Sequence, residues 1–214
     1  MSPTILITAG ATRELLDPVR YIANHSSGHL GCQLALAAAI SGCKTTLLLS
    51  GAGESPTCHP RLQTHRFTTT RDLESLIHQH WPSHSILIMA AAVADFTPKG
   101  GSQDSKIPRG DTMSLSLVPT ADLVAIAAKS ARDDQKVIAF ALGEHDKFEE
   151  VAKEKLKRKG VDAIVANPLR TMNAKNITAT IFTKDGKSWS PPSECSKTEF
   201  ASWLVENLTT FLPS

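Results

Sequence analysis

The sequence predicts an α/β fold, in which a Rossmann-like, doubly wound and mostly parallel sheet carries helices on its faces. Short apolar runs of strand length alternate with helix-patterned segments of roughly 10–15 residues. Small or polar residues follow these runs directly, at the place where ligands of such sheets bind. Residues 1–214 are expected to form one domain, with a small C-terminal hairpin as an extension.

The first half of the chain is predicted to contain two helices and four strands. The four strands cover residues 5–7, 44–49, 65–68 and 86–89. The first helix follows Gly28 and ends near residues 41–42, because Leu30 and Leu34 recur at helical spacing. A loop with a turn at Pro18 precedes it. Thr70 is predicted to cap the second helix.

In the second half, the polar residues 97–111 have no hydrophobic period, which predicts a long loop of the kind that forms lids or binding loops. Strands are expected at residues 113–118, 137–141 and 162–166, and a loop at 143–148. Helices are expected at 121–130, capped by Pro119 and Thr120, and at 149–159. Residues 178–187 predict a hairpin. The S-x-x-E pattern at 196–199 predicts a last helix, which continues through Leu208.

Composition excludes several classes of function. Hydrophobic residues make up 41% and charged residues 21% of the chain, as in ordinary globular proteins. A net charge of +2 gives no support for binding to nucleic acid or to a membrane surface. No apolar run approaches the roughly 20 residues that span a bilayer, and no signal peptide is expected. The four cysteines have no C-x-x-C spacing, which favours a reducing cytoplasm.

The start of the first helix is a candidate anion site. Ser26, Ser27 and Gly28 precede the helix, and Gly10 ends the strand before it. Unpaired N–H groups, the helix dipole and two hydroxyls all favour an anion there. A plain N-cap is the alternative. The glycines are too widely spaced for the G-x-G-x-x-G pattern of dinucleotide sites.

Several other polar residues have both a functional and a structural interpretation. The amide of Asn24 could orient a carbonyl group, or could serve only in a turn. Lys106 could close over a phosphate, or could be merely solvated. Lys155 and Lys159 share a helix face and could clamp a triphosphate, or could only complement the helix dipole. Asp95 could bind a ribose hydroxyl or a metal, or could end a turn.

A dinucleotide-dependent reductase is a weaker alternative. Its second strand should be followed by an acidic or basic selector. Residues 49–51 read Leu-Ser-Gly instead, and Tyr21 is followed four residues later by His25 rather than by a lysine. There is no G-x-S-x-G hydrolase motif, and the eight histidines show no metal-ligand spacing.

Three early runs closely resemble the phosphopantothenoylcysteine synthetase family. They are Thr-Ala-Gly-Ala-Thr-Arg-Glu at 8–14, Asp-Pro-Val-Arg-Tyr-Ile at 17–22 and Asn-His-Ser-Ser-Gly at 24–28. The resemblance continues through residues 90–95, 106–107 and 121–124, and through the helix with Lys155 and Lys159 to residues 166–167. It therefore covers nearly the whole chain in order.

The resemblance implies a cytoplasmic ligase of coenzyme A biosynthesis. CTP, with Mg²⁺, would activate 4'-phosphopantothenate as an acyl-cytidylate, and L-cysteine would then displace CMP. The family is typically homodimeric, and a chain of this length resembles the stand-alone form, which needs a separate decarboxylase. Two alternatives stay open: an ATP-using version of the ligase, as in some lineages, and a non-catalytic regulatory module that binds a nucleotide.

The resemblance also implies roles for individual residues. Asn24 and Lys106 would be catalytic, and Arg20 and Ala92 would bind the substrate together with Asn24. No protein side chain is expected to bind the metal. The residues implied in nucleotide binding are Gly10, Ser26, Ser27, Gly28, Met89, Ala90, Ala91, Asp95, Lys106, Ala121, Asp122, Leu123, Val124, Phe140, Lys155 and Lys159.

Overall fold

The computed structural model describes residues 2–51, 53–110, 112–143, 148–169 and 176–212. Within these ranges, eight strands form the main sheet in the order β13-β12-β10-β9-β6-β1-β4-β5. Six of them are parallel to one another: β1 (Thr4–Ala9), β4 (Lys44–Ser50), β5 (Leu62–Phe67), β6 (Ile86–Met89), β9 (Lys136–Gly143) and β10 (Ala163–Pro168). The predicted hairpin, β12 (Thr180–Thr183) and β13 (Ser188–Trp189), extends one edge in antiparallel pairing. The predicted fold class is confirmed.

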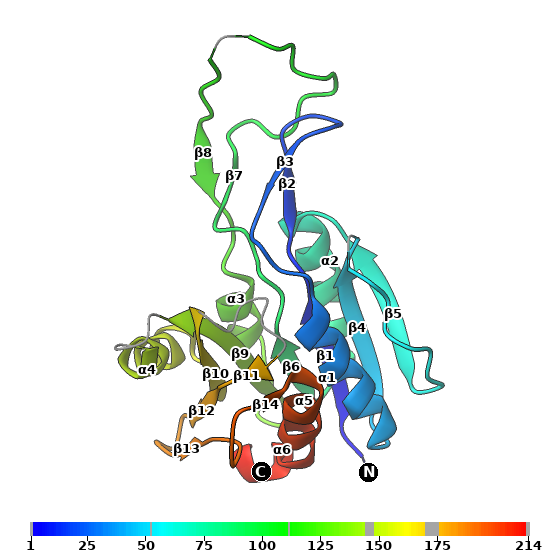
Figure 1. Ribbon diagram of the computed structural model, residues 1–214, viewed down its shortest axis with the longest axis vertical. Coiled ribbons are helices and arrows are strands. Elements are labelled where there is room, and N and C mark those ends of the chain that lie inside the picture. Colours follow the sequence, from blue (N-terminus) through cyan, green and yellow to red (C-terminus); the bar gives the residue numbers. More distant parts are fainter. Residues whose placement is uncertain (1, 52, 111, 144–147, 170–175, 213–214) are drawn as a thin grey trace.

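Helices cover both faces of this sheet (Figure 1). One apolar cluster joins the sheet to α1 (His29–Ile40), α5 (Lys197–Glu206) and α6 (Leu208–Phe211). The other joins it to α2 (Thr70–His80), the short helix η1 (Trp81–Ser83), α3 (Leu123–Lys129) and α4 (Phe148–Lys159). Along β1 the side chains alternate between the two clusters, with Ile5 and Ile7 in the first and Leu6 in the second. The apolar runs of the sequence are therefore strands buried on both faces.

The chain winds outward in both directions from the centre of the sheet. β1 pairs with β4 on one side and with β6 on the other, so that Thr8 lies between Leu48 and Met89. The connection through α1 leads to β4, whereas the later connections through α3 and α4 lead from β6 to β9 and β10. A crevice is expected at such a switch point, beyond the carboxyl ends of β1 and β6.

Two predicted helix caps are wrong by one or two residues. Thr69, not Thr70, caps α2 in a capping box with Asp72, because the Thr70 hydroxyl donates instead to the buried Glu14 carboxylate at 2.7 Å. Asp122, not Thr120, caps α3. Several strand ends also differ by a few residues, and β5 begins at Leu62 rather than at His65.

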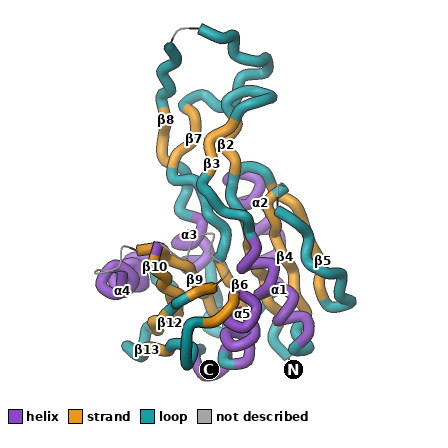
Figure 2. Tube along the Cα trace, viewed as in Figure 1, coloured by secondary structure: helices purple, strands orange, loops and turns teal. Residues whose placement is uncertain are grey.

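Two antiparallel ribbons project from the sheet and form an arm, defined here as residues 13–23, 96–110 and 112–119 (Figures 1 and 2). One ribbon pairs β2 (Arg13–Leu15) with β3 (Tyr21–Ala23), and the other pairs β7 (Phe96–Pro98) with β8 (Leu117–Pro119). The sequence predicted a loop with a turn at Pro18 in place of the first ribbon, and a loop over residues 97–111. The strand predicted at 113–118 is wrong over most of its length, because residues 113–116 are exposed and lie outside the ribbon.

Asp17 organises the arm. Its fully buried carboxylate accepts hydrogen bonds from the N–H groups of Val19, Arg20 and Ile107 at 2.7, 2.8 and 3.0 Å. The Arg20 guanidinium also lies 3.1 Å from this carboxylate and donates to the Ile107 carbonyl at 3.0 Å. Burial favours the neutral acid, but these N–H groups and Arg20 outweigh burial and lower the pKa of Asp17. The segment that carries Lys106 is thereby fastened to the turn after β2.

The C-terminal part returns to the centre of the molecule. A small ribbon of β11 (Asn176–Ile177) and β14 (Cys195–Ser196) leads into α5. The predicted capping box of Ser196 and Glu199 is confirmed. α5 ends at Glu206, so the expectation that it continues through Leu208 is wrong. Most of the loop expected at 143–148 lies outside the described residues. In the described part of the chain, no helix is long and apolar enough to cross a membrane.

Candidate functional site

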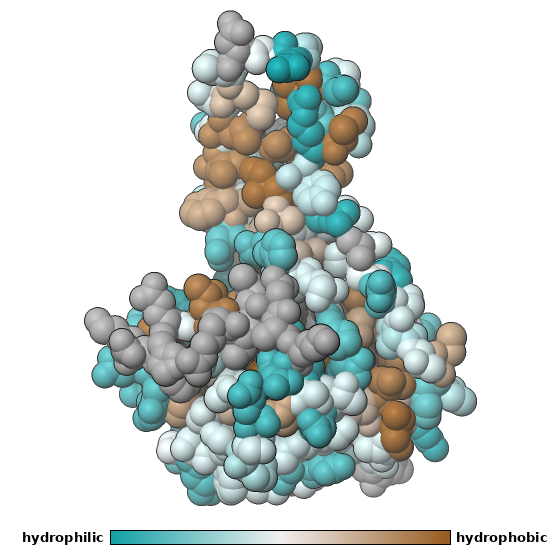
Figure 3. Space-filling view, viewed as in Figure 1, coloured by the Kyte–Doolittle hydropathy of each residue, from teal (hydrophilic) through white to brown (hydrophobic). Residues whose placement is uncertain are grey.

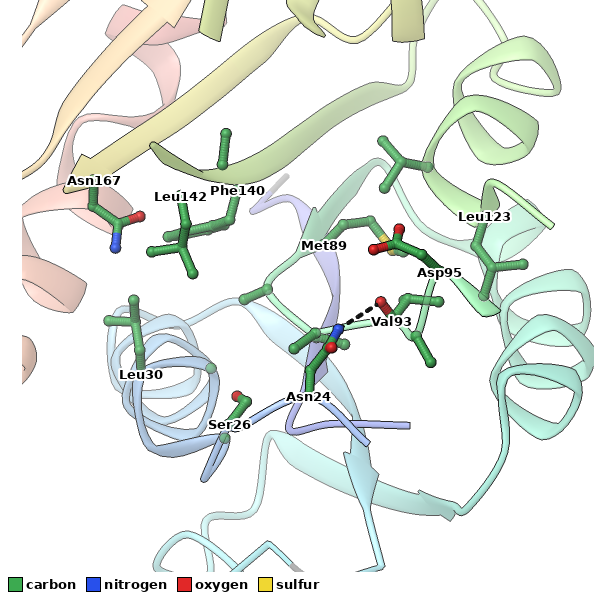
Figure 4. A pocket seen from close by; sticks show the side chains of 18 of the residues that line it. Asn24, Ser26, Leu30, Met89, Val93, Asp95, Leu123, Phe140, Leu142 and Asn167 are labelled. Carbon is green, nitrogen blue, oxygen red and sulfur yellow. Dashed lines mark hydrogen bonds between the residues drawn. The ribbon is translucent and has the colours of Figure 1, made fainter. Parts of the chain in front are cut away.

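An open pocket of about 670 Å³ lies at the switch point of the sheet, a size typical of small-molecule sites. Its walls come from residues 24–31 before and within α1, residues 89–95 after β6, residues 120–124 before and within α3, and the ends of β9 and β10. Basic residues of α4 and α5 complete the lining. Figure 4 shows Asn167 and Leu30 on one side of the pocket and Asp95 and Leu123 on the other.

The start of α1 rests directly on the end of β1. Gly28, the residue before α1, has φ +79°, and a Cβ atom there would lie 2.9 Å from the Gly10 nitrogen. A Cβ atom at Gly31 would lie 2.5 Å from the Ala9 Cβ atom. Only glycine fits at these positions. Because Gly28 has no side chain to cap the helix, the first turn of α1 keeps N–H donors for a ligand in the pocket.

Backbone contacts explain the run of alanines after β6. The Thr8 hydroxyl accepts from the Ala91 N–H at 3.1 Å, and the Thr12 hydroxyl accepts from the Ala94 N–H at 2.9 Å. The Ala92 N–H donates to the Gly10 carbonyl at 2.9 Å. Hydrogen bonds therefore hold the alanine-rich segment against residues 8–12, at the end of β1 and just after it. The small side chains of the segment leave its backbone open to the pocket.

Asn24 joins the two segments that form the centre of the pocket. Its Nδ2 atom donates to the Val93 carbonyl at 2.9 Å (Figure 4). This bond fixes the orientation of an otherwise exposed amide. A primary amide has a second N–H and a carbonyl oxygen, so the fixed group can still orient a ligand.

Basic residues of α4 line the side of the pocket that lies near α3. The Lys159 Nζ atom lies 3.1 Å from the Asp122 carboxylate. Burial disfavours the Asp122 anion, but the Ala125 N–H and Lys159 outweigh it and lower the pKa of Asp122. Burial, with the nearby charges of Lys159 and Arg158, lowers the pKa of Lys155, although Asp95 opposes this shift. Cations and carboxylates therefore partly neutralise each other here.

The structure brings most of the predicted site residues together. Lining the pocket are Asn24, Ser26, Ser27, Gly28, Met89, Ala90, Ala91, Ala92, Asp95, Ala121, Asp122, Leu123, Val124, Phe140, Lys155 and Lys159. Three predicted site residues are not among the described residues that line the pocket: Gly10, Arg20 and Lys106. Gly10 lies beneath Gly28, whereas Arg20 and Lys106 are on the arm.

Other lining residues were not selected from the sequence. Asn167 is the second-last residue of β10 and Leu142 is the second-last residue of β9, so the rule that ligands bind at the carboxyl ends of the strands could have indicated both. Arg158 lies beside Lys155 and Lys159 on α4. Lys197 at the start of α5 has no such sequence signal, because the packing of α5 against α1 and the pairing of β11 with β14 bring it to the pocket.

Among the described residues, no group of three His, Cys, Asp or Glu side chains could hold a metal ion. Of the two lining aspartates, Asp122 is already paired with Lys159. Mg²⁺ commonly binds substrate phosphates and water rather than a full set of protein ligands.

Comparison with known proteins gives consistent results. The family model described as "DNA/pantothenate metabolism flavoprotein C-terminal domain" matches residues 2–212. The "Coenzyme A biosynthesis bifunctional protein CoaBC" of Vibrio cholerae is 38% identical over 191 residues, which are 86% of this chain and 47% of that protein. The chain thus spans about half the length of the curated relatives it matches.

Two solved structures are similar over nearly the whole chain. A DNA/pantothenate metabolism flavoprotein from Streptococcus pneumoniae has a TM-score of 0.83 at 26% identity, covering 99% of this chain and 100% of its own. The C-terminal domain of a CoaBC protein has a TM-score of 0.80 at 31% identity, covering 97% of this chain and 94% of its own. The overall fold is therefore shared with these proteins.

Proposed function

Because the chain belongs to the family of the DNA/pantothenate metabolism flavoprotein C-terminal domain, we propose that it is a ligase of coenzyme A biosynthesis. It joins 4'-phosphopantothenate to L-cysteine through an acyl-cytidylate formed from CTP and Mg²⁺. It does so as a homodimer in the cytoplasm, with a decarboxylase acting separately on the product. One observation carries the proposal: the hydrogen bond from Asn24 to Val93 joins the two main runs of family resemblance at the centre of the pocket.

In the first half-reaction, a carboxylate oxygen of phosphopantothenate attacks the α-phosphorus of the nucleotide. A P–O bond to the carboxylate forms, the bond to the β-phosphate breaks, and pyrophosphate leaves. Two anions must approach each other, so the main demand on the protein is positive potential. The N–H donors of α1 and the lysines supply it.

In the second half-reaction, the cysteine amine attacks the activated acyl carbon. A C–N bond forms, the C–O bond to the nucleotide phosphate breaks, CMP leaves and the amine proton passes to solvent. Negative charge develops on the acyl oxygen during this step. Asn24 is held in place to donate a hydrogen bond to that oxygen.

The proposal is tested by turnover of the purified chain with 4'-phosphopantothenate, L-cysteine, Mg²⁺ and either CTP or ATP. We expect mass spectrometry to detect the amide product with CTP. Product with ATP but not with CTP would support the ligase assignment and change the assigned nucleotide from CTP to ATP. Nucleotide binding without any product would instead support the regulatory module.

The arm is the proposed dimer interface. Six large apolar side chains are exposed on it: Val19, Tyr21, Phe96, Met113, Leu115 and Leu117. Figure 3 shows apolar residues gathered over the arm. Patches of this kind mark interaction surfaces. A second copy that docks there would cover the patch. Arg20 and Lys106 of one copy could then enter the pocket of the other copy, which accounts for their absence from the pocket lining of their own chain.

Replacing both Met113 and Leu117 with lysine is expected to convert the dimer to a monomer, because like charges would then face each other across a two-fold interface. Analytical ultracentrifugation should give twice the chain mass of 23.0 kDa for the unmodified protein and the chain mass for the variant. Ile40→Lys, at an exposed apolar residue of α1, is the control. An unmodified monomer, or a dimeric double variant, would refute the arm interface.

Replacing Lys155 with alanine is expected to raise the KM for CTP by about tenfold to 100-fold, the usual effect of losing one hydrogen bond to a charged group. Lys155 is half-buried in the pocket wall opposite Asp95. Lys157→Ala is the control, since Lys157 is exposed on the same helix away from this pocket. A nucleotide KM unchanged by Lys155→Ala would assign α4 to structural support alone.

A further inference from the structure

Three buried polar side chains next to the pocket wall have no role in the half-reactions described above. Thr12 lies between β1 and β2, Glu14 lies in β2, and Thr70 is the first residue of α2. Thr12 is fully buried, and Glu14 and Thr70 are each 5% exposed. A hydroxyl or carboxylate is costly to bury unless it is hydrogen-bonded. The hydrogen bonds of these three side chains therefore indicate which part of the pocket they hold in place.

The Thr12 hydroxyl holds one peptide group of the pocket wall. It accepts a hydrogen bond from the Ala94 N–H at 2.9 Å. The carbonyl of the same peptide group belongs to Val93, and it accepts from the Asn24 amide at 2.9 Å. In a trans peptide such as this one, the N–H and the C=O point in opposite directions. Thr12 on one side therefore sets the direction of the carbonyl that orients Asn24 on the other side.

The Glu14 carboxylate ties this contact to the start of α2. Its Oε1 atom accepts from the Thr70 N–H at 2.9 Å and from the Thr70 hydroxyl at 2.7 Å. Two donors at the N-terminal end of a helix suit a buried carboxylate. The Thr70 hydroxyl also lies 3.1 Å from the Thr12 hydroxyl. The start of α2 thereby braces the Thr12 hydroxyl from the side away from Ala94.

We propose that Thr12 is a positioning residue for the amide-forming step, and that Glu14 and Thr70 hold Thr12 in place. Thr12 is not among the described residues that line the pocket. It acts on Asn24 through the peptide that joins Val93 to Ala94. This inference rests on the proposed function and adds to it the device that fixes the orientation of Asn24.

The first test uses NMR and is independent of turnover. Thr12→Val keeps the shape of the side chain and removes the acceptor. It should shift the side-chain amide proton of Asn24 upfield, because the hydrogen bond to Val93 becomes weaker. Asn24→Asp, which lacks this amide, identifies the signal. Thr12→Ser keeps the hydroxyl and should keep the signal in place. Thr45→Val is the matched control, since the buried Thr45 hydroxyl also makes a bond to the backbone, at the Cys43 carbonyl at 3.2 Å.

The second test measures the two half-reactions separately. Thr12→Val is expected to slow amide formation, started by adding cysteine to the preformed acyl-nucleotide, by about tenfold. Pyrophosphate release should stay within about twofold of that of the unmodified protein. Glu14→Gln should have a smaller effect on the same step, because glutamine keeps an oxygen acceptor and loses only the charge. In the Asn24→Asp background, Thr12→Val should cause no further loss, because Thr12 acts only through Asn24.

The outcomes separate this proposal from the proposed function. An unchanged Asn24 signal in Thr12→Val, equal losses in both half-reactions, or losses that multiply in the double variant would overturn the role of Thr12 and leave the ligase intact. If the unmodified protein makes no amide, the proposed function fails, and the NMR test still decides whether Thr12 orients Asn24. If Thr12→Val does not fold by circular dichroism, Thr70→Val decides instead: it should shift the Asn24 signal in the same direction, and an unchanged signal would overturn the proposal.

Discussion

Replacing Lys106 with glutamine is expected to abolish formation of the acyl-nucleotide, so that pyrophosphate release falls by at least about 100-fold. Glutamine is one atom shorter than lysine, keeps a polar N–H donor at its end and removes the charge. Lys106 is exposed on the arm, and the neighbouring Ile107 is fastened to Asp17 and Arg20. An ammonium group delivered by a fixed segment can neutralise charge at the α-phosphate without a large entropic cost.

The control is Lys99→Gln, which removes a charge from an exposed lysine on the same arm. Its pyrophosphate release should stay near that of the unmodified protein. Near-normal release by Lys106→Gln would remove Lys106 from the mechanism.

Mixed dimers show which subunit Lys106 serves. Consider a dimer of one Lys106→Gln subunit and one Asn24→Asp subunit. The pocket of the Lys106→Gln subunit keeps Asn24 and receives an arm with an intact Lys106 from the Asn24→Asp subunit. An equal mixture that exchanges freely should regain about one quarter of the unmodified activity, because half of the dimers are mixed and each contains one complete site. No recovery in dimers proven to be mixed would mean that Lys106 serves its own pocket.

Replacing Asn24 with aspartate is expected to leave the first half-reaction largely intact and to slow the second by about 100-fold to 1,000-fold, the usual effect of losing one donor to a developing oxyanion. Attack on phosphorus creates no charge on the acyl oxygen, whereas attack on the acyl carbon does. Aspartate cannot donate to Val93 or to the acyl oxygen. The acyl-cytidylate should therefore accumulate, and quenched-flow mass spectrometry should detect it.

Asn207→Asp is the matched control, since the Asn207 amide also donates to a backbone carbonyl, that of Trp203 at 2.8 Å. It removes the same kind of hydrogen bond away from the pocket. If Asn24→Asp reduced pyrophosphate release as strongly as it reduced amide formation, the assigned role in the second step would be wrong.

The sheet and the pocket centre could be predicted because their signals are local. An apolar run such as Ile5-Leu6-Ile7 is a buried strand in any parallel sheet, and its carboxyl end must lie near those of its neighbours. Ser26, Ser27 and Gly28 adjoin the first strand in sequence. The family resemblance implies one site for the runs around Asn24 and Val93, and the structure places the two runs in contact.

The arm and Lys197 could not be predicted in the same way. The strands of the arm have three residues each, and the two ribbons are far apart in the sequence. Their apolar residues are exposed, so no buried face produces a regular pattern. Lys197 reaches the pocket through the packing of α5 against α1 and the pairing of two-residue strands, and neither contact leaves a local sequence signal.

The measurement that tests the account most directly is pyrophosphate release in the absence of cysteine. The purified chain would be mixed with 4'-phosphopantothenate, Mg²⁺ and CTP, with ATP in parallel. Two half-reactions in one pocket predict a burst of about one pyrophosphate per active site, dependent on phosphopantothenate, followed by steady turnover once cysteine is added. No release of pyrophosphate until cysteine is present would contradict an acyl-nucleotide intermediate, and no release under any of these conditions would contradict the ligase itself.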